Sequence, residues 1–283
     1  MLWPTAMGAL ADDALRTQAL QVEEQLAPII EEGGQSGALA RAQAMNEELA
    51  ARTSLWLDDN AGPAGYYEWQ PAGSDIVASI EIPALDLVLP VRLGTSDEVL
   101  ASGVGHLPGS SLPVGGTSTH CVLSGHTAYR DIRLFDDIGQ LEPGDSVALR
   151  SCAGTLRYRV VSTSIVEPTD ATKLAIEPGR DLLTLVTCYP PTVNTQRLLV
   201  LCERDLQAES AYGDTAPDEY DVDANRAQGS DSINDGTARV PGWVIAGLCL
   251  VVSLSAGVLV VLIMALPQLR GPRAIGRHAQ KGP

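Results

Sequence analysis

The sequence has few aromatic residues, and this scarcity limits what its core and its surface can do. Phe, Trp and Tyr together make up 4% of the 283 residues, and Phe135 is the only phenylalanine. Ile, Val, Leu and Ala must therefore fill the core, and the β-branched members of this set favour strands. The composition favours a β-rich domain over a surface that stacks nucleic-acid bases.

Basic residues are scarce as well. The chain has 19 Lys and Arg against 35 Asp and Glu, which gives a formal net charge of -16 at pH 7. The phosphates of nucleic acids select basic surfaces, so this balance argues against a nucleic-acid partner. The length allows one sizeable domain with extensions.

The sequence also lacks the usual motifs for metals and phosphate groups. No Cys-x-x-Cys pair occurs, the histidines do not fall at zinc spacing, and no Gly-rich phosphate loop is visible. We therefore expect neither a metal nor a cofactor. The five cysteines are Cys121, Cys152, Cys188, Cys202 and Cys249. Because their number is odd, at least one thiol would stay free even outside the cell, where cysteines tend to form disulfides. Pairing among Cys121, Cys152 and Cys202 stays open, with buried apolar residues as the simpler interpretation.

Between residues 74 and 205 the sequence is a series of short apolar runs separated by Pro and Gly turns. Such runs are typical of strands. They lie at 76–82, 87–91, 121–126, 146–150, 155–166, 182–187 and 198–201. Residues 99–105 are instead expected to form a helical turn that enters a loop, and residues 134–138 a short helix. Many short strands with such turns favour a closed barrel or a sandwich.

Residues 1–73 form an N-terminal extension. Apolar spacing predicts solvated amphipathic helices at 12–30 and 38–51, followed by a loop-like stretch at 53–73. Residues 1–10 are apolar with no Lys or Arg in front, which makes them a poor signal peptide. Because a large domain rarely crosses a membrane without an export signal, we expect the natural start to lie upstream.

The C-terminal part changes character twice. Residues 206–242 are rich in Asp, Glu, Ala, Gly and Ser, which predicts a flexible acidic stalk. Residues 243–266 are apolar and uncharged, and these 24 residues are long enough to span a hydrocarbon core of roughly 30 Å. A basic tail follows at 267–283. By the positive-inside bias we expect a single-pass cell-membrane protein with a cytoplasmic C-terminus and the 74–205 domain outside the cell.

Three residue types suited to nucleophilic catalysis stand at the ends of predicted strands. Cys188 follows the run 182–187, and the prolines after it cannot continue a ladder because they lack an N–H. Arg197 opens the next run, and His126 ends the run that begins at Cys121. A thiol, an imidazole and a permanent cation on one rim can make a nucleophilic site.

Two other histidines compete with His126. His120 lies about six residues of ~3.3 Å rise away along the same strand, so it does not easily share a site with it. His106 is expected to lie in a loop with a structural role.

These residues carry a resemblance to a known family. Thr184-Leu185-Val186-Thr187-Cys188 resembles the Thr-Leu-x-Thr-Cys signature of the sortases, the cysteine transpeptidases of Gram-positive cell surfaces. Asn194-Thr195-Gln196-Arg197 resembles the arginine strand of the class C, pilus-assembling branch. Further matching motifs are Ile80-Glu81-Ile82-Pro83, Gly105 to Gly116, and Ser124-Gly125-His126. The resemblance implies a mainly β fold, a closed eight-stranded sortase-type barrel with short helices.

The resemblance also implies a reaction. Cys188 attacks the threonine carbonyl of a Leu-Pro-x-Thr-Gly-like sorting signal in a surface or pilin protein, and a thioester forms. His126 acts as general acid and then as general base, while Arg197 holds the substrate carbonyl or the oxyanion. Thr187 and Ser124 are expected to bind substrate. The threonine is then joined to a lysine amine of a pilin, without a cofactor.

Two alternatives stay open. One is a sortase that attaches surface proteins to peptidoglycan. The other is a non-catalytic, membrane-tethered adhesin or scaffold, against which the intact set of Cys188, His126 and Arg197 argues. The C-terminal anchor, the long N-terminal extension and the Asn-Thr-Gln-Arg run favour pilus assembly.

In class C sortases the region that corresponds to 53–73 forms a lid over the thiol and usually carries Asp-Pro followed by an aromatic residue. This sequence has no such triplet there. Trp56 with Asp58 and Asp59 is the nearest substitute, and an ordinary surface loop with one packed tryptophan is the alternative.

A triple variant in which Ala replaces Trp56, Asp58 and Asp59 tests the lid. Such a cover must open easily and so be held by few contacts, and its removal should speed the alkylation of Cys188 with little change in the melting temperature. Equal alkylation rates in parent and variant would mean that the loop is not a lid, or that Tyr66, Tyr67 and Trp69 anchor it.

Overall fold

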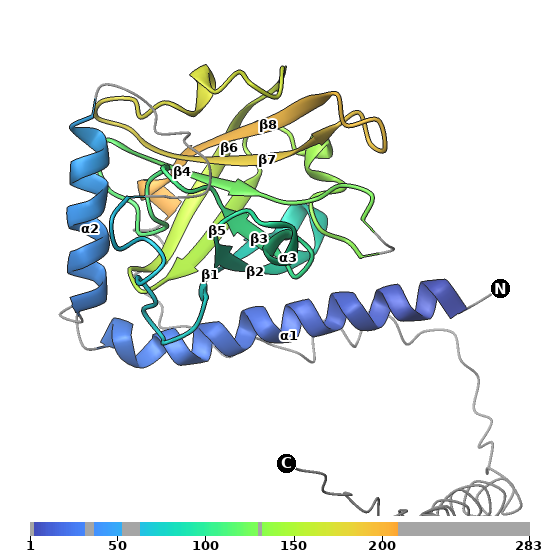
Figure 1. The fold of residues 1–283 in the computed structure, drawn as a ribbon, viewed down its shortest axis with the longest axis horizontal. Helices are drawn as coiled ribbons and strands as arrows, with labels where there is room; N and C mark the ends of the chain where they lie inside the picture. Colours follow the sequence, from blue (N-terminus) through green and yellow to red (C-terminus); the bar gives the residue numbers. More distant parts are fainter. Residues whose placement is uncertain (1–2, 32–36, 53–62, 130–131, 209–283) are drawn as a thin grey trace, which may run out of the picture. The chain divides into compact units, whose positions relative to one another are not determined.

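The computed structural model describes residues 3–31, 37–52, 63–129 and 132–208, and its fold is shown in Figure 1. Eight strands form a closed barrel in the order β1-β2-β3-β4-β7-β8-β6-β5. The strands are β1 Ile76–Ile82, β2 Leu87–Leu93, β3 Val104–His106, β4 Thr119–Ser124, β5 Ser146–Ser151, β6 Gly154–Val166, β7 Asp181–Tyr189 and β8 Gln196–Arg204. The expected mainly β, closed eight-stranded barrel is confirmed.

Helical elements are few. They are α1 Trp3–Glu31, α2 Gly37–Ala50, α3 Asp97–Leu100 and the single-turn 3₁₀ helices η1 Pro83–Leu85, η2 Ile138–Gln140 and η3 Thr172–Leu174. Within the described ranges no helix has the length and apolarity needed to cross a bilayer. The span predicted at 243–266 lies outside those ranges.

Two local predictions were wrong. Residues 99–105 were expected to form a helical turn that enters a loop; the helical turn α3 ends at Leu100, but β3 begins at Val104, where the loop was expected. β3 is three residues long and pairs with β2 on one side and β4 on the other, so tertiary pairing makes it a strand. The short helix expected at 134–138 is instead a turn that precedes η2.

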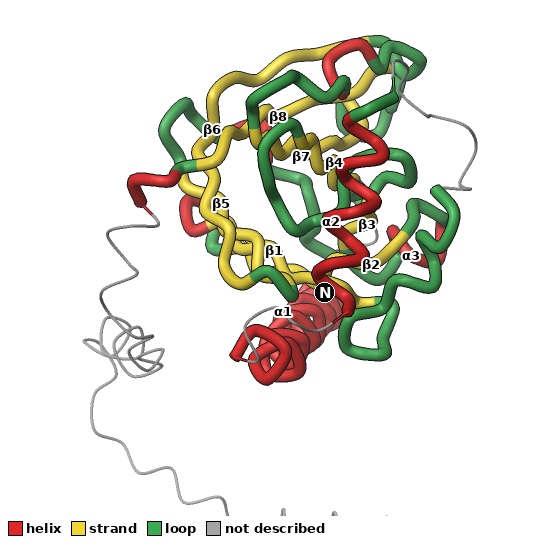
Figure 2. Tube along the Cα trace, turned by 90° about the vertical axis from the view of Figure 1, so that its left-hand side faces the viewer, coloured by secondary structure: helices red, strands yellow, loops and turns green. Residues whose placement is uncertain are grey.

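The pairing of the strands decides which ends meet. Most neighbours are antiparallel, but β2 with β3 and β4 with β7 run parallel. The strands of Figure 2 run around a common interior. In the β4–β7 pair Thr119 lies opposite Asp181 and Ser124 lies opposite Val186, so both strands end at the same rim of the barrel.

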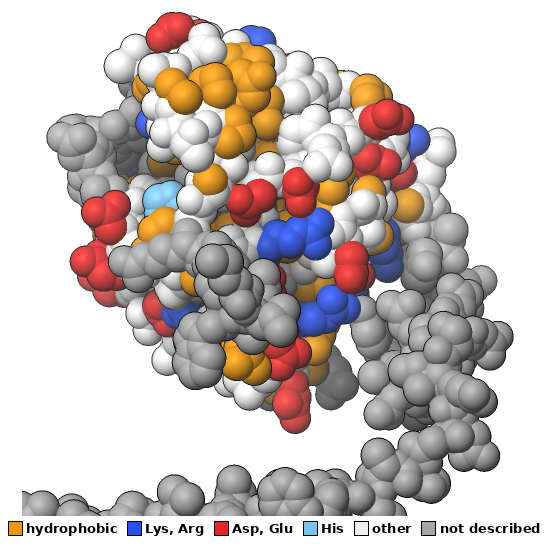
Figure 3. Space-filling view, turned by 90° about the vertical axis from the view of Figure 1, so that its right-hand side faces the viewer, with side chains coloured by type: hydrophobic (Ala, Val, Ile, Leu, Met, Phe, Trp, Pro, Cys, Tyr) orange, Lys and Arg blue, Asp and Glu red, His pale blue; other side chains and the backbone are white. Residues whose placement is uncertain are grey.

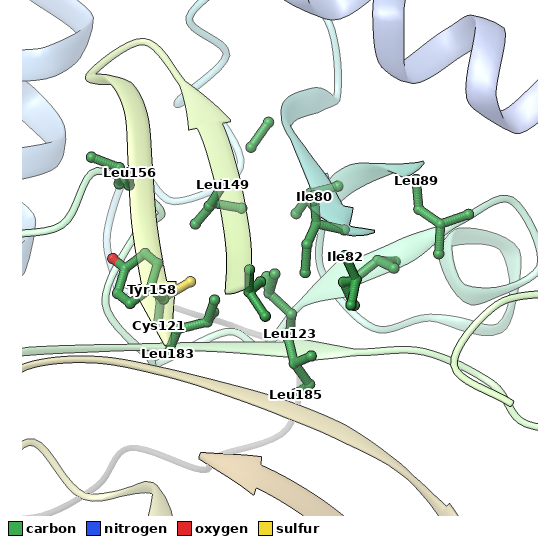
Figure 4. Close-up of a cluster of buried hydrophobic side chains, with 14 of the residues drawn as sticks. Ile80, Ile82, Leu89, Cys121, Leu123, Leu149, Leu156, Tyr158, Leu183 and Leu185 are labelled. Atoms are coloured by element: carbon green, nitrogen blue, oxygen red, sulfur yellow. The ribbon is translucent and has the colours of Figure 1, made fainter. Parts of the chain in front are cut away.

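The barrel interior is filled by aliphatic side chains, as the composition required. Figure 4 shows the cluster with labelled residues Ile80, Ile82, Leu89, Cys121, Leu123, Leu149, Leu156, Tyr158, Leu183 and Leu185. The four described cysteines are free thiols, and Cys121, Cys152 and Cys202 are buried. Burial raises the pKa of each, to about 11 for Cys152 and about 12 for Cys202. The interpretation of these three as buried apolar residues is confirmed.

Helix α1 lies along the outside of β1 and β2 (Figure 1), so it is packed and not simply solvated. Its apolar stripe Leu15, Ala19, Val22 and Leu26 is buried. A polar contact fixes the same face. The Glu23 carboxylate accepts two bonds from Arg150 Nη1, at 2.8 and 2.9 Å, and one from the Ser79 hydroxyl at 2.7 Å.

Helix α2 and residues 63–73 are attached through buried hydrogen bonds. The Asn46 amide donates to Leu112 O at 3.2 Å and accepts from Leu112 N at 2.7 Å. The Trp69 indole donates to Ala38 O at 2.8 Å. Because a buried polar group needs a partner, the Asn46 bonds fix α2 to the β3–β4 connection and the Trp69 bond fixes residues 63–73 to α2.

The most deeply buried contact between the extension and the barrel joins Tyr66 to His106. His106 is fully buried at the end of β3, not in a loop, and its Nε2 lies 2.8 Å from Ser111 O. Because a carbonyl only accepts, Nε2 carries the proton and Nδ1 is free to accept from the Tyr66 hydroxyl at 2.8 Å. Burial lowers the pKa of His106 to about 4. The expected structural role fits these contacts.

This burial predicts a loss of stability in mild acid. The unfolded chain protonates His106 near pH 6.5 and the folded chain only near pH 4, so the unfolded state binds more protons in this window. The free energy of unfolding should fall as the pH drops from 6.5 towards 4, by up to about 3 kcal/mol. Urea unfolding at several pH values measures it. His106→Gln should reduce the dependence of the free energy of unfolding on pH between pH 5 and 7. A smaller dependence should remain, because burial also lowers the pKa of His120. An unchanged dependence would contradict this account.

Candidate active site

Cys188 and Arg197 are direct partners across the antiparallel β7–β8 pair. Side chains of directly opposite residues lie on one face with Cβ atoms about 4.5–5.5 Å apart. Leu183 and Leu185 of β7 enter the barrel core. Successive side chains of a strand alternate between its two faces, and Cys188 is three residues after Leu185, so Cys188 points to the outer face. Both Cys188 and Arg197 are half-buried. The pairing therefore sets the Cys188 and Arg197 side chains next to each other on the outer face.

The guanidinium of Arg197 is held by its own turn. Its Nη1 donates to Asn194 O at 3.2 Å and to Gln196 O at 3.0 Å. Within the described part of the chain it forms no ion pair with a carboxylate. Five N–H donors and a permanent charge leave it able to bind a further oxygen.

His126 reaches the same rim through the parallel β4–β7 pair. Ser124 lies opposite Val186, and His126 and Cys188 each follow two residues later, so the register places them level. Gly125 continues the pairing, because its N–H donates to Val186 O at 3.0 Å. The predicted site residues Cys188, His126 and Arg197 thus stand at neighbouring strand ends.

The two predicted substrate-binding residues are placed differently. The Thr187 hydroxyl donates to Gly125 O at 2.8 Å, and its side chain is buried. This bond ties β7 to the start of the loop that carries His126. Ser124 is half-buried on the outer face, two residues before His126. Substrate contact by either residue stays a prediction.

Sequence reasoning missed the residues that hold His126. The Tyr129 ring is stacked on the imidazole with centroids 4.6 Å apart and planes at 14°. The His126 carbonyl accepts from Phe135 N at 3.0 Å. A Cβ on Gly125 would lie 2.7 Å from the Phe135 ring, so only glycine fits there. The Gly-His pair was visible in the sequence, but nothing in it marked Tyr129.

The competing histidine His120 is engaged elsewhere. It is buried, and its Nδ1 donates to Ala175 O at 2.8 Å while its Nε2 lies 2.7 Å from the Thr184 hydroxyl. Burial lowers its pKa. Its bonds tie β4 and β7 to the β6–β7 connection.

A second, buried apolar cluster lies on the outer face of the sheet, near Cys188. It consists of Val122, Val166, Leu174 and Leu199, with Leu107, Ala171 and Val186 packed against it. Val186 precedes Cys188 by two residues and Leu199 follows Arg197 by two, so the buried cluster and the site share one face of the sheet. Figure 3 shows the end of the molecule that carries the β7–β8 turn, with hydrophobic side chains gathered above intermixed acidic and basic ones.

The predicted lid residues Trp56, Asp58 and Asp59 lie outside the described residues. Among the residues that are described, no group of three or more His, Cys, Asp or Glu side chains could hold a metal ion.

Comparisons with known proteins agree on one family. A model of the Sortase domain matches residues 80–205. Sortase D of Bacillus subtilis (strain 168) is 32% identical over 151 residues, which cover 53% of this chain and 72% of that protein.

Solved structures point the same way. Sortase C-1 from Actinomyces oris superposes with a TM-score of 0.54 at 39% identity, over 59% of this chain and 94% of that one. Sortase C of Clostridium perfringens, solved with the C-terminal cell wall sorting motif, has a TM-score of 0.57 at 34% identity, over 67% of this chain and 98% of that one. The chain therefore belongs to the sortase family, in its class C branch, whose members are cysteine transpeptidases.

Proposed function

We propose that this protein is a membrane-anchored cysteine transpeptidase that joins a sorting-signal protein to a pilin lysine. Its substrate is a surface or pilin protein with a C-terminal Leu-Pro-x-Thr-Gly-like signal. The catalytic domain, residues 74–205, stands outside the cell on the acidic stalk 206–242. A single span at 243–266 and the tail 267–283 fix it to the membrane.

One observation carries the proposal: the register that sets Cys188 opposite Arg197 and level with His126. A nucleophile, a proton carrier and an oxyanion donor within reach of one carbonyl are the parts that acyl transfer needs. The neighbouring sortase C of Clostridium perfringens was solved with a cell wall sorting motif, which supports a substrate of this class.

The reaction has two halves. In the first, Cys188 sulfur bonds to the threonine carbonyl carbon, the bond to glycine nitrogen breaks, and His126 gives that nitrogen a proton. In the second, the lysine amine loses a proton to His126 and attacks the thioester, and the C–S bond breaks to return the thiolate. Arg197 binds the oxyanion in both halves with a fixed planar fork of donors. The chemistry balances without a cofactor.

Replacement of Cys188 and Arg197 tests these roles. Cys188→Ala should abolish transpeptidation of a sorting-signal peptide without unfolding the barrel. Arg197→Lys should lower kcat/KM on the order of 10²-fold, because a point charge does not replace the fork. Arg159→Lys is the matched control, since Arg159 lies half-exposed on β6 and pairs with Asp205 at the surface. Turnover in Cys188→Ala, or equal losses in the two arginine variants, would contradict the roles.

The accepting amine is tested by competition. The protein is given one sorting-signal peptide with equal amounts of a pilin-derived lysine peptide and a peptidoglycan stem-peptide amine. A product joined mainly to the pilin lysine is expected. A product joined mainly to the stem peptide would favour cell-wall anchoring, and no Cys188-dependent product at all would favour a non-catalytic adhesin or scaffold.

A further inference from the structure

His126 begins a connection whose described residues are held by hydrogen bonds from within and from helix α1. We name the described residues 127–129 and 132–137 the histidine loop. Tyr129 and Ile132 form a β-bridge, and the loop returns to His126 through the bond from Phe135 N to the His126 carbonyl. The side chains of Leu134 and Phe135 are buried in the main core. The position of His126 therefore depends on the position of this loop.

A carboxylate closes the loop from inside. Asp136 Oδ1 accepts from Ala128 N at 2.6 Å, and Asp136 Oδ2 accepts from Leu134 N at 2.9 Å. Ala128 has a φ of 56°, in the left-handed region, which a residue with a Cβ adopts only when its surroundings fix it. Bonds from N–H groups to a carboxylate are stronger than neutral ones. Asp136 thus spans the two arms of the loop.

A second carboxylate holds the loop from outside, and it comes from helix α1. Asp12 Oδ1 accepts from Arg133 N at 2.9 Å, across 121 positions of sequence. Arg133 is two residues before Phe135, whose N–H bonds to His126. Farther along α1, Glu23 and the buried apolar stripe fix the helix to the barrel. α1 is therefore a rigid support for the histidine loop.

The setting of Asp12 points to a specific contact and not to a general charge effect. Asp12, Asp13, Arg16 and Arg133 line a cavity of about 270 Å³ that also reaches Asp86. Asp12 is half-buried, whereas its neighbour Asp13 is exposed. Arg133 has its own acidic partner, because its Nε donates to Asp137 at 3.2 Å. What Asp12 binds is the backbone of the loop.

We propose that Asp12 is a positioning residue for His126, and that helix α1 acts through it as part of the catalytic apparatus. Asp12 lies outside the stretch 80–205 that matches the Sortase domain, so that stretch alone is incomplete as a catalyst. The inference rests on the proposed function, in which His126 passes protons to and from two different amines. Such transfer requires hydrogen-bond reach, and a misplacement of about 1 Å can cost on the order of 10²-fold in rate.

The test compares Asp12→Ala, Asp12→Asn and Asp13→Ala in the full chain, with a sorting-signal peptide and a lysine peptide. Alanine removes the acceptor for Arg133 N, whereas asparagine keeps it through Oδ1. Asp12→Ala should lower kcat by about three- to tenfold with KM unchanged. Asp12→Asn and Asp13→Ala should stay near the parent. The rate of Cys188 alkylation should not change, because the thiol is not moved.

A double-mutant comparison shows whether Asp12 acts through the loop. Asp136→Asn leaves only one oxygen to accept, so it should also lower kcat. The effects on kcat of two changes that loosen the same loop should not multiply. The Asp12→Ala, Asp136→Asn variant should therefore show a smaller fold-loss in kcat than the product of the two single fold-losses. Independent, multiplying losses would contradict the inference.

The remaining outcomes separate this inference from the proposed function. If the parent shows no Cys188-dependent turnover, the proposed function is wrong and the role of Asp12 falls with it. If the parent turns over and Asp12→Ala keeps its kcat, only the inference is wrong. A loss in Asp12→Ala that Asp12→Asn shares, or one accompanied by a lower melting temperature and slower Cys188 alkylation, would show a purely structural role and also overturn it.

Discussion

The parallel pairing of β4 with β7 is the constraint on which the site depends. In this pair Ser124 lies opposite Val186, so the residues two positions later, His126 and Cys188, lie at the same level of the rim. The antiparallel pairing of β7 with β8 then adds Arg197 beside Cys188. A shift of the first pair by one residue would turn the outer face of β7 inward, and the thiol would enter the aliphatic core. The barrel's closure fixes that register.

The N-terminal extension and the barrel form one packed unit through buried polar contacts. Glu23 binds Arg150, Asn46 binds the backbone of Leu112, and Tyr66 binds His106. The contacts of Asn46 and Tyr66 are buried, so truncating either side chain would leave a buried polar group of the barrel unpaired, at a cost of roughly 1–3 kcal/mol per group. The extension is thus a structural partner of the barrel, and the Asp12 contact extends this partnership to the loop that carries His126.

The sequence predicted what periodicity and chemical type can carry. Short apolar runs marked seven of the eight strands, and the thiol, imidazole and guanidinium at strand ends indicated the site. It missed β3, because three residues in Gly-containing sequence have no period and become a strand only between β2 and β4. It also missed Asp12, since a contact across 121 positions of sequence leaves no local pattern. Tyr129 and Asp136 are near His126 in sequence, but an irregular loop has no period that marks which side chains fold back on it.

The central claim is that Cys188 is the nucleophile of an acyl transfer, and the most direct measurement is the mass of the intact protein after brief incubation with a sorting-signal peptide. The account predicts a hydroxylamine-sensitive adduct, with the mass of the peptide up to its threonine, on Cys188 alone. The buried thiols Cys121, Cys152 and Cys202 should stay unmodified. No adduct, or an adduct on one of those three cysteines, would contradict the claim.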